Sequence, residues 1–240
     1  MLSWTAMTKD ELERQYSPSR WSHRMAADDV IKAHVKALKE GTDRARGLAQ
    51  TLLNVPYGEG EGERLDAYIP TTNSLDVPLV IYFHGGYWQF LSGLYLCGHS
   101  AGAHLAAMIL STDWSQYSSM PQIKGAFLVS GIYDLLPILS TYVNKPLKMT
   151  EEVAIRNSPS KLIPQLKLSS SSCLIVVAVA ENDSPEFRKQ SEDYYNTLKA
   201  TGLNVTLEDV PNTDHFSIIE QLIDGDYHLT KLLLKMMGKS

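Results

Sequence analysis

The sequence predicts an α/β fold in which helices cover both faces of a mainly parallel β-sheet. From residue 77 onward, strand-like and helix-like segments alternate along the chain. The runs at residues 77–83 and 173–180 are almost continuously apolar, as expected for parallel strands that are buried on both faces. The 240 residues contain no repeat, low-complexity tract or evident linker, so we expect a single domain over residues 1–240.

The first third of the chain predicts two helices and a half-buried strand. Thr8 followed by Glu11 is a capping-box pattern, so a short helix should begin directly after Thr8. Apolar residues recur at a rough helical period through residues 28–53. Residues 63–69 alternate between apolar and polar side chains and predict a strand, which residues 70–76 end in a turn.

The rest of the chain predicts a regular succession of buried strands and helices. Thr150 has the position of an N-cap, and Gly202 has the position of a helix stop. The predicted strands are residues 77–83, 94–97, 123–129, 173–180 and 203–210, and the predicted helices are residues 101–110, 149–157, 185–199 and 216–237.

Composition is typical of a soluble globular protein, with 44% hydrophobic and 20% charged residues. The net charge of −5 and a pI near 5.8 argue against the basic surface of a nucleic-acid-binding protein. The apolar runs are too short to span a membrane, and residues 1–20 lack the apolar core of a secretory signal. We expect Cys97 and Cys173 to be buried, reduced thiols of a cytosolic protein rather than a disulfide or a metal pair.

Residues 98–102 read GHSAG, the G-x-S-x-G pattern of a nucleophile elbow. A serine hydroxyl is a weak nucleophile until a neighbouring base takes its proton, and a sharp strand-to-helix turn presents it to such a base. A predicted strand precedes this pattern and a predicted helix follows it, which favours a true elbow with Ser100 as nucleophile. The alternative is a glycine-rich turn that carries an ordinary exposed serine.

The partners of such a serine should follow it in the order acid and then base. Asp183 comes just after a late buried strand, and His215 lies just before the last helix, so both have the expected positions. Of the competing acids, we expect Glu181 to be a solvated loop carboxylate and Asp134 to brace its own loop. The other candidate bases fit less well, because one would be a surface residue of the last helix and three come too early in the chain: His228, His23, His34 and His104.

Residues 84–86 read HGG and supply the remaining part of such a site. Without side chains at Gly85 and Gly86, backbone N–H groups can turn toward a developing oxyanion. The N–H of Ala101, directly after the nucleophile, is the expected second arm of this oxyanion hole. A plain strand-ending turn is the weaker interpretation because the elbow is also present.

Together these motifs resemble the kynurenine formamidase (arylformamidase) family of the α/β-hydrolase superfamily. The HGGYW and GHSAGAHLA blocks are far more specific than the generic elbow, and the resemblance runs from about residue 57 to the final helix. The segments that carry it are His84-Gly85-Gly86-Tyr87-Trp88, residues 96–105, residues 183–187 and Asp214-His215-Phe216.

The resemblance implies hydrolysis of N-formyl-L-kynurenine to L-kynurenine and formate, in tryptophan breakdown. Ser100 would attack the formyl carbon, His215 would act as the base, and Asp183 would hold its imidazole. Each backbone donor of the oxyanion hole would contribute about 3–4 kcal/mol. The donors implied are the N–H groups of Gly85, Gly86 and Ala101.

The resemblance also implies what surrounds the reaction. Tyr87 and Trp88 would line an aryl pocket, although aromatic residues beside a loop are as often core filler. The substrate is a small molecule, and we expect no metal or organic cofactor and no nucleic-acid or membrane partner. A homodimer and a location in the cytoplasm and the nucleus are further expectations.

The spacing of the two motifs departs from the family. One strand and two helices normally lie between the HGG loop and the elbow strand, about 60 residues, whereas only residues 87–93 lie there in this chain. Parallel strands usually need a crossover of a dozen residues or more, and seven extended residues reach at most about 25 Å. We therefore expect an α/β-hydrolase fold that lacks one central strand and two helices, through an internal deletion near residues 91–93 arising from a splice variant or a faulty gene model. An exposed apolar sheet face and a misplaced oxyanion loop should follow.

Three other functions compete with formamidase activity. A broad carboxylesterase would carry the same elbow and HGG loop. A catalytically impaired isoform, which binds partners or misfolds, would carry the same shortened segment. A generic binding module is the weakest alternative because three triad residues occur in the expected order.

Overall fold

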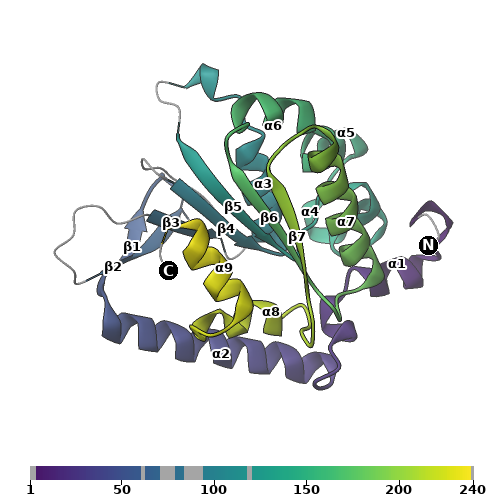
Figure 1. Ribbon diagram of the computed structural model, residues 1–240. Coiled ribbons are helices and arrows are strands. Elements are labelled where there is room, and N and C mark those ends of the chain that lie inside the picture. Colours follow the sequence, from purple (N-terminus) through teal and green to yellow (C-terminus); the bar gives the residue numbers. More distant parts are fainter. Residues whose placement is uncertain (1–3, 61–62, 71–78, 84–93, 118–120, 239–240) are drawn as a thin grey trace.

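A parallel sheet lies at the centre of the computed structural model, with helices on both of its faces (Figure 1). The structure describes residues 4–60, 63–70, 79–83, 94–117 and 121–238. Five strands are hydrogen-bonded in the order β3-β4-β5-β6-β7, and each neighbouring pair is parallel. The predicted α/β fold with a mainly parallel sheet is confirmed.

Short 3₁₀ turns connect several of the helices and strands that the structure describes. The strands are β1 (Gln50–Pro56), β2 (Arg64–Ile69), β3 (Leu79–Phe83), β4 (Leu94–His99), β5 (Ile123–Val129), β6 (Leu174–Ala180) and β7 (Val205–Val210). The helices are α1 (Lys9–Gln15), α2 (Ala27–Leu48), α3 (Ala101–Leu110), α4 (Asn144–Leu147), α5 (Glu151–Arg156), α6 (Ile163–Ser169), α7 (Pro185–Ala200), α8 (Ser217–Glu220) and α9 (His228–Met236).

Two hydrophobic clusters fill the space between the sheet and its helices. One lies against α3, α6 and α7, where Leu110 and Val177 are fully buried. The other lies against α8 and α9 and contains Ile218, Leu229 and Val176. Because Val176 and Val177 are neighbours on β6 but face opposite clusters, that strand must be apolar on both faces. This explains its continuous apolar sequence.

Two of the predicted helix caps are present. The Thr8 hydroxyl accepts a hydrogen bond of 3.2 Å from the N–H of Glu11 at the start of α1. The Thr150 hydroxyl accepts one of 3.3 Å from the N–H of Val153 at the start of α5. These local signals were readable because cap and helix are adjacent in sequence.

The predicted helix over residues 28–53 is wrong in its last part. α2 ends at Leu48, and residues 50–53 belong to β1, which pairs antiparallel with β2. Leu52 faces Ala67 in this pairing, and Asn54, with φ 56°, forms a bulge. Hydrogen bonding to β2 therefore outweighs the helical period of the segment.

The single helix predicted over residues 216–237 is also wrong, because the segment is broken into α8, a 3₁₀ turn and α9. Between them, the Asp224 carboxylate accepts a hydrogen bond of 2.9 Å from the N–H of Asp226. Asp and Gly favour such turns over helix continuation, and Gly225 follows Asp224.

The two strands that flank the shortened segment are paired. β3 and β4 run parallel with Leu79 opposite Leu94 and Phe83 opposite Gly98, and ten residues of sequence connect them. β1 and β2 form a separate two-stranded sheet that is not hydrogen-bonded to β3. Among the residues that the structure describes, β3 is therefore an edge strand.

Two further expectations concern thiols and membranes. Cys97 and Cys173 are buried and free, and burial raises the pKa of both thiols to about 12. No helix in the described part of the chain is long and apolar enough to cross a membrane.

Candidate active site

A sharp turn joins β4 to α3 at Ser100, whose φ is 56° and ψ is −121°. Residues other than glycine rarely adopt positive φ, and such strain concentrates at functional sites. A Cβ at Gly98 would lie 2.2 Å from the carbonyl oxygen of Gly102, so this close approach of strand and helix requires glycine. The Ser100 side chain does not cap α3, and the turn holds it at the carboxyl end of the sheet.

Asp183 and His215 form a buried pair at the same end of the sheet. The His215 Nδ1 atom lies 2.7 Å from the Asp183 Oδ1 atom, and the two side chains are 3% and 0% exposed. A carboxylate only accepts hydrogen bonds, so Nδ1 carries the hydrogen, and Nε2 is the ring atom that could act as an acceptor. Phe187 packs edge-on against the imidazole at 4.9 Å between ring centroids.

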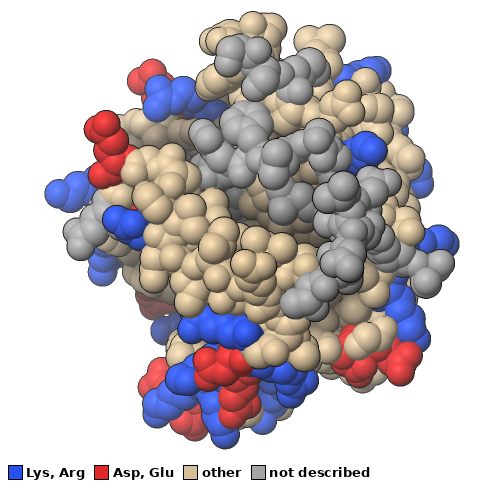
Figure 2. Space-filling model, turned by 90° about the vertical axis from the view of Figure 1, so that its left-hand side faces the viewer, with Lys and Arg blue, Asp and Glu red and all other residues tan. Residues whose placement is uncertain are grey.

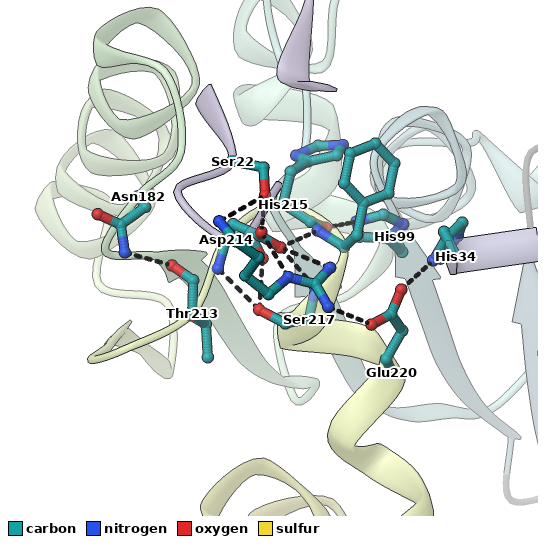
Figure 3. Close-up of polar contacts among 11 residues, drawn as sticks. Ser22, His34, His99, Asn182, Thr213, Asp214, His215, Ser217 and Glu220 are labelled. Carbon is teal, nitrogen blue, oxygen red and sulfur yellow. Dashed lines mark hydrogen bonds and ion pairs between the residues drawn. The ribbon is translucent and has the colours of Figure 1, made fainter. Parts of the chain in front are cut away.

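His99 connects the turn at Ser100 to His215. Its Nε2 atom lies 2.7 Å from the carbonyl oxygen of His215, and the two imidazole centroids are 4.6 Å apart (Figure 3). Because a carbonyl only accepts, Nε2 of His99 carries the hydrogen. Burial and the neighbouring His215 hold the pKa of His99 well below its ordinary value, so its ring stays neutral. The residue before Ser100 thus contacts both the ring and the backbone of His215.

Ser130 holds the second oxygen of Asp183. Its hydroxyl donates to Asp183 Oδ2 at 2.5 Å, and the N–H of Ala180 donates to the same oxygen at 3.2 Å. Ser130 is fully buried at the end of β5 and has a φ of 47°, which is strained for serine. Ser130 could not be predicted from the sequence, because nothing local marks a serine after a strand as a partner of a residue 53 positions later.

Asp214, adjacent to His215, accepts side-chain hydrogen bonds that the sequence does not indicate. Arg24 binds both of its carboxylate oxygens, and Ser22 donates to one of them. Figure 3 shows Ser22, Ser217 and Glu220 around this corner. Segments about 190 residues apart in sequence therefore meet beside His215.

The competing residues lie elsewhere. Glu181 is exposed and accepts a hydrogen bond of 2.7 Å from the N–H of Asn212. Asp134 accepts one of 3.0 Å from the N–H of Leu136 and pairs with Lys161, so it braces its own loop. The four competing histidines bond to groups outside the Asp183–His215 pair or are exposed: His34 to Glu220, His104 to the Asn157 carbonyl, His228 to Glu208, and His23 exposed.

The HGGYW motif lies outside the described residues, and with it His84, Gly85, Gly86, Tyr87 and Trp88. The other predicted oxyanion donor, the N–H of Ala101, belongs to the first residue of α3. A helix N-terminus carries unpaired N–H groups and a partial positive charge, which suits a developing oxyanion. No group of three or more His, Cys, Asp or Glu side chains within the described residues is arranged to hold a metal ion.

Comparison with known proteins identifies the family. A kynurenine formamidase of Salmo salar is 70% identical, and one of Danio rerio is 62% identical, each alignment covering all of both chains. The chain belongs to the kynurenine formamidase family. A kynurenine formamidase of Drosophila melanogaster is 25% identical over 93% of this chain and 96% of that protein. No protein-family model matches the chain.

Solved structures agree with this family at the level of the fold. A crystal structure of a Silicibacter protein described as a thioesterase matches 91% of this chain and 98% of its own, with a TM-score of 0.68 and 21% identity. A truncated carbohydrate esterase from gut microbiota matches 80% and 98%, with a TM-score of 0.58. These neighbours support an α/β-hydrolase fold for the chain.

The length of the alignments bears on the shortened segment. The alignment with the Salmo salar protein extends over 294 positions although this chain has 240 residues, so at least 54 of its positions have no residue here. This total is close to the roughly 60 residues expected for one strand and two helices. That these positions fall between β3 and β4 stays a prediction.

Proposed function

We propose that this chain is a serine hydrolase that cleaves N-formyl-L-kynurenine to L-kynurenine and formate. Membership of the kynurenine formamidase family supports this substrate. The observation that carries the proposal is the buried Asp183–His215 pair, which meets the strained turn of Ser100 through His99. That arrangement suits acyl transfer to a serine.

The residues divide the reaction as follows. The Ser100 Oγ atom attacks the formyl carbon while Nε2 of His215 takes its proton, and Asp183 stabilises the imidazolium that forms. The oxyanion is stabilised by the N–H of Ala101 and by N–H groups of Gly85 and Gly86. His215 then returns the proton to the departing aryl amine. Water, activated by the same imidazole, hydrolyses the formyl-serine and releases formate.

The surroundings of the reaction are part of the proposal. Tyr87 and Trp88 line the aryl side of the pocket, and the chemistry requires no metal or organic cofactor. The partner is a small-molecule substrate. We also expect the chain to form a homodimer and to be located in the cytoplasm and the nucleus.

A comparison of substrates tests the assignment against a broad carboxylesterase. The chain should hydrolyse N-formylkynurenine with a far higher kcat/KM than 4-nitrophenyl acetate. Asp183→Asn should lower kcat by about 10⁴-fold, whereas Glu181→Gln should leave it nearly unchanged. A preference for the ester, or an equal effect of both substitutions, would contradict the substrate or the assigned acid.

A catalytically impaired isoform is the second candidate, and a specific observation favours it. At least 54 positions of the alignment with the Salmo salar protein have no residue in this chain. Only ten residues join β3 to β4, and β1 and β2 form a separate sheet. Apolar side chains at this end are exposed, among them Leu52, Tyr68 and Tyr82. In the coloured part of the centre of the face shown in Figure 2, most residues are other than Lys, Arg, Asp and Glu, and this is the side that carries β1, β2 and β3 in Figure 1.

Fluorophosphonate labelling distinguishes the two candidates. An active chain should be labelled on Ser100, melt cooperatively and be labelled at a rate comparable with that of the Salmo salar relative. An impaired isoform should be labelled much more slowly, or not at all, under conditions in which the relative reacts fully.

A further inference from the structure

Asp214, the residue before His215, fixes the backbone at the start of α8. Its Oδ1 atom accepts hydrogen bonds from the N–H groups of Phe216 at 3.0 Å and Ser217 at 2.8 Å. In return, the N–H of Asp214 donates to the Ser217 hydroxyl at 2.8 Å. These reciprocal bonds resemble those of a capping box and enclose His215, so Asp214 fixes the backbone from which the His215 side chain extends.

Arg24, from the N-terminal part of the chain, donates hydrogen bonds to both oxygens of the Asp214 carboxylate. Its Nε atom lies 2.8 Å from Asp214 Oδ2, and its Nη2 atom lies 3.2 Å from Oδ1. Its Nη1 atom donates to Glu220 Oε2 at 3.0 Å, on the same short helix. A guanidinium is a rigid planar fork, so these three bonds fix the relative position of Asp214 and Glu220.

Arg24 determines the charge state of the buried Asp214 carboxylate. The Asp214 side chain is only 3% exposed, whereas Arg24 is 35% exposed. Burial alone would raise the pKa of Asp214, but hydrogen bonds from Arg24, the N–H of Ser217 and Ser22 outweigh it and lower that pKa. Asp214 is thus a buried anion at neutral pH, and Arg24 is the cation that bonds to it.

The same helix receives a second contact from α2. The His34 Nδ1 atom lies 2.7 Å from Glu220 Oε1 (Figure 3). The His34 ring also packs against Phe216, with 4.9 Å between the ring centroids. Phe216 in turn meets the His215 ring edge-on at 5.5 Å. The N-terminal part of the chain therefore supports both ends of the segment 214–220.

We propose that Arg24 is a positioning residue for the catalytic base. By bonding to both Asp214 and Glu220, it fixes the backbone of His215. The imidazole therefore stays between Asp183 and the turn at Ser100. The inference rests on the proposed function, since it takes His215 to be the base. The competing explanation is that Arg24 only stabilises the fold.

Three variants of the full chain separate these explanations. Arg24→Gln removes the charge and the fork, and Arg24→Lys keeps the charge without the fork. Arg46→Gln is the matched control, because Arg46 forms an exposed 3.4 Å pair with Asp66 at the far end of α2. The readouts are kcat and KM for N-formylkynurenine, the rate of Ser100 labelling by a fluorophosphonate, the melting temperature and the downfield proton NMR signal of His215 Nδ1–H.

A displaced base should affect the chemical step more than binding. Arg24→Gln should lower kcat and the labelling rate by about 10- to 100-fold, the cost of a shift of about 1 Å, with KM within about twofold. It should also broaden the His215 signal, while Arg24→Lys recovers part of the rate and Arg46→Gln behaves as the wild type. The proposal is overturned if Arg24→Gln has the same kcat per labelled site as the wild type, even if its melting temperature is lower.

The readouts also separate this inference from the proposed function. If the wild type is labelled but does not turn over N-formylkynurenine, the substrate assignment fails and the labelling rates decide the role of Arg24. If the wild type is not labelled, the NMR signal decides it, and an identical signal in wild type and Arg24→Gln overturns the proposal.

Discussion

Ser130 offers a sharp test of the catalytic role proposed for Asp183. Its hydroxyl is bonded at 2.5 Å to Asp183 Oδ2, while the other carboxylate oxygen holds His215. Replacing Ser130 by alanine removes this donor and leaves Oδ2 with the longer bond from the N–H of Ala180. We expect the carboxylate to lose orientation and part of its capacity to stabilise the imidazolium.

The magnitude follows from burial. A hydrogen bond to a charged group contributes about 1.5–3 kcal/mol, and the Asp183 side chain is 0% exposed, so bulk water does not replace the lost donor. Since about 1.4 kcal/mol corresponds to a tenfold change in rate, Ser130→Ala should lower kcat/KM by about 10- to 100-fold.

Matched variants separate the lost bond from backbone strain. Ser130 has a φ of 47°, so Ser130→Gly relieves strain while also removing the hydroxyl. Both variants should lose similar activity, although the glycine variant should melt higher than the alanine variant. Ser111→Ala removes a buried hydroxyl that donates to the Ala107 carbonyl at the end of α3, and should leave kcat/KM unchanged. The reasoning is refuted if the alanine and glycine variants both stay within twofold of the wild type.

Two further predictions concern His99 and Asp214. His99→Gln keeps an N–H donor near the position of Nε2 and should retain most of kcat. His99→Phe removes this donor to the His215 carbonyl and should lower kcat about tenfold. Equal rates of the two variants in steady-state assays would contradict the role of this hydrogen bond. Asp214 and Glu220 have lowered pKa values in the folded chain, so their stabilisation is present above the ordinary carboxyl pKa of about 4 and is lost as pH falls further. The difference in unfolding free energy between wild type and Arg24→Gln should therefore be largest above about pH 4 and shrink below it, and denaturant titrations that show a constant or growing difference would contradict this.

Much of the fold was readable from local sequence, because its signals are local. Almost continuous apolar runs marked β3 and β6, and the predicted helix at residues 101–110 has the bounds of α3. β1 was missed because its hydrogen bonds go to β2, and the break before α9 depends on a three-residue turn inside an otherwise helical pattern.

The site divides in the same way. Ser100, Asp183 and His215 could be proposed from motif and chain order, and the structure brings Asp183 and His215 together. Ser130 and Arg24 could not be found, because their importance lies in contacts with residues 53 and 190 positions away. A hydrogen bond between distant segments leaves no periodicity or spacing in a single sequence.

Formate release from N-formyl-L-kynurenine is the most direct test of the central claim. The wild-type chain should release one formate for each kynurenine, and Ser100→Ala should lower kcat by about 10⁴-fold or more without loss of the folded state. Equal rates in the two proteins, or no formate release from a wild-type chain that is folded and labelled at Ser100, would contradict it.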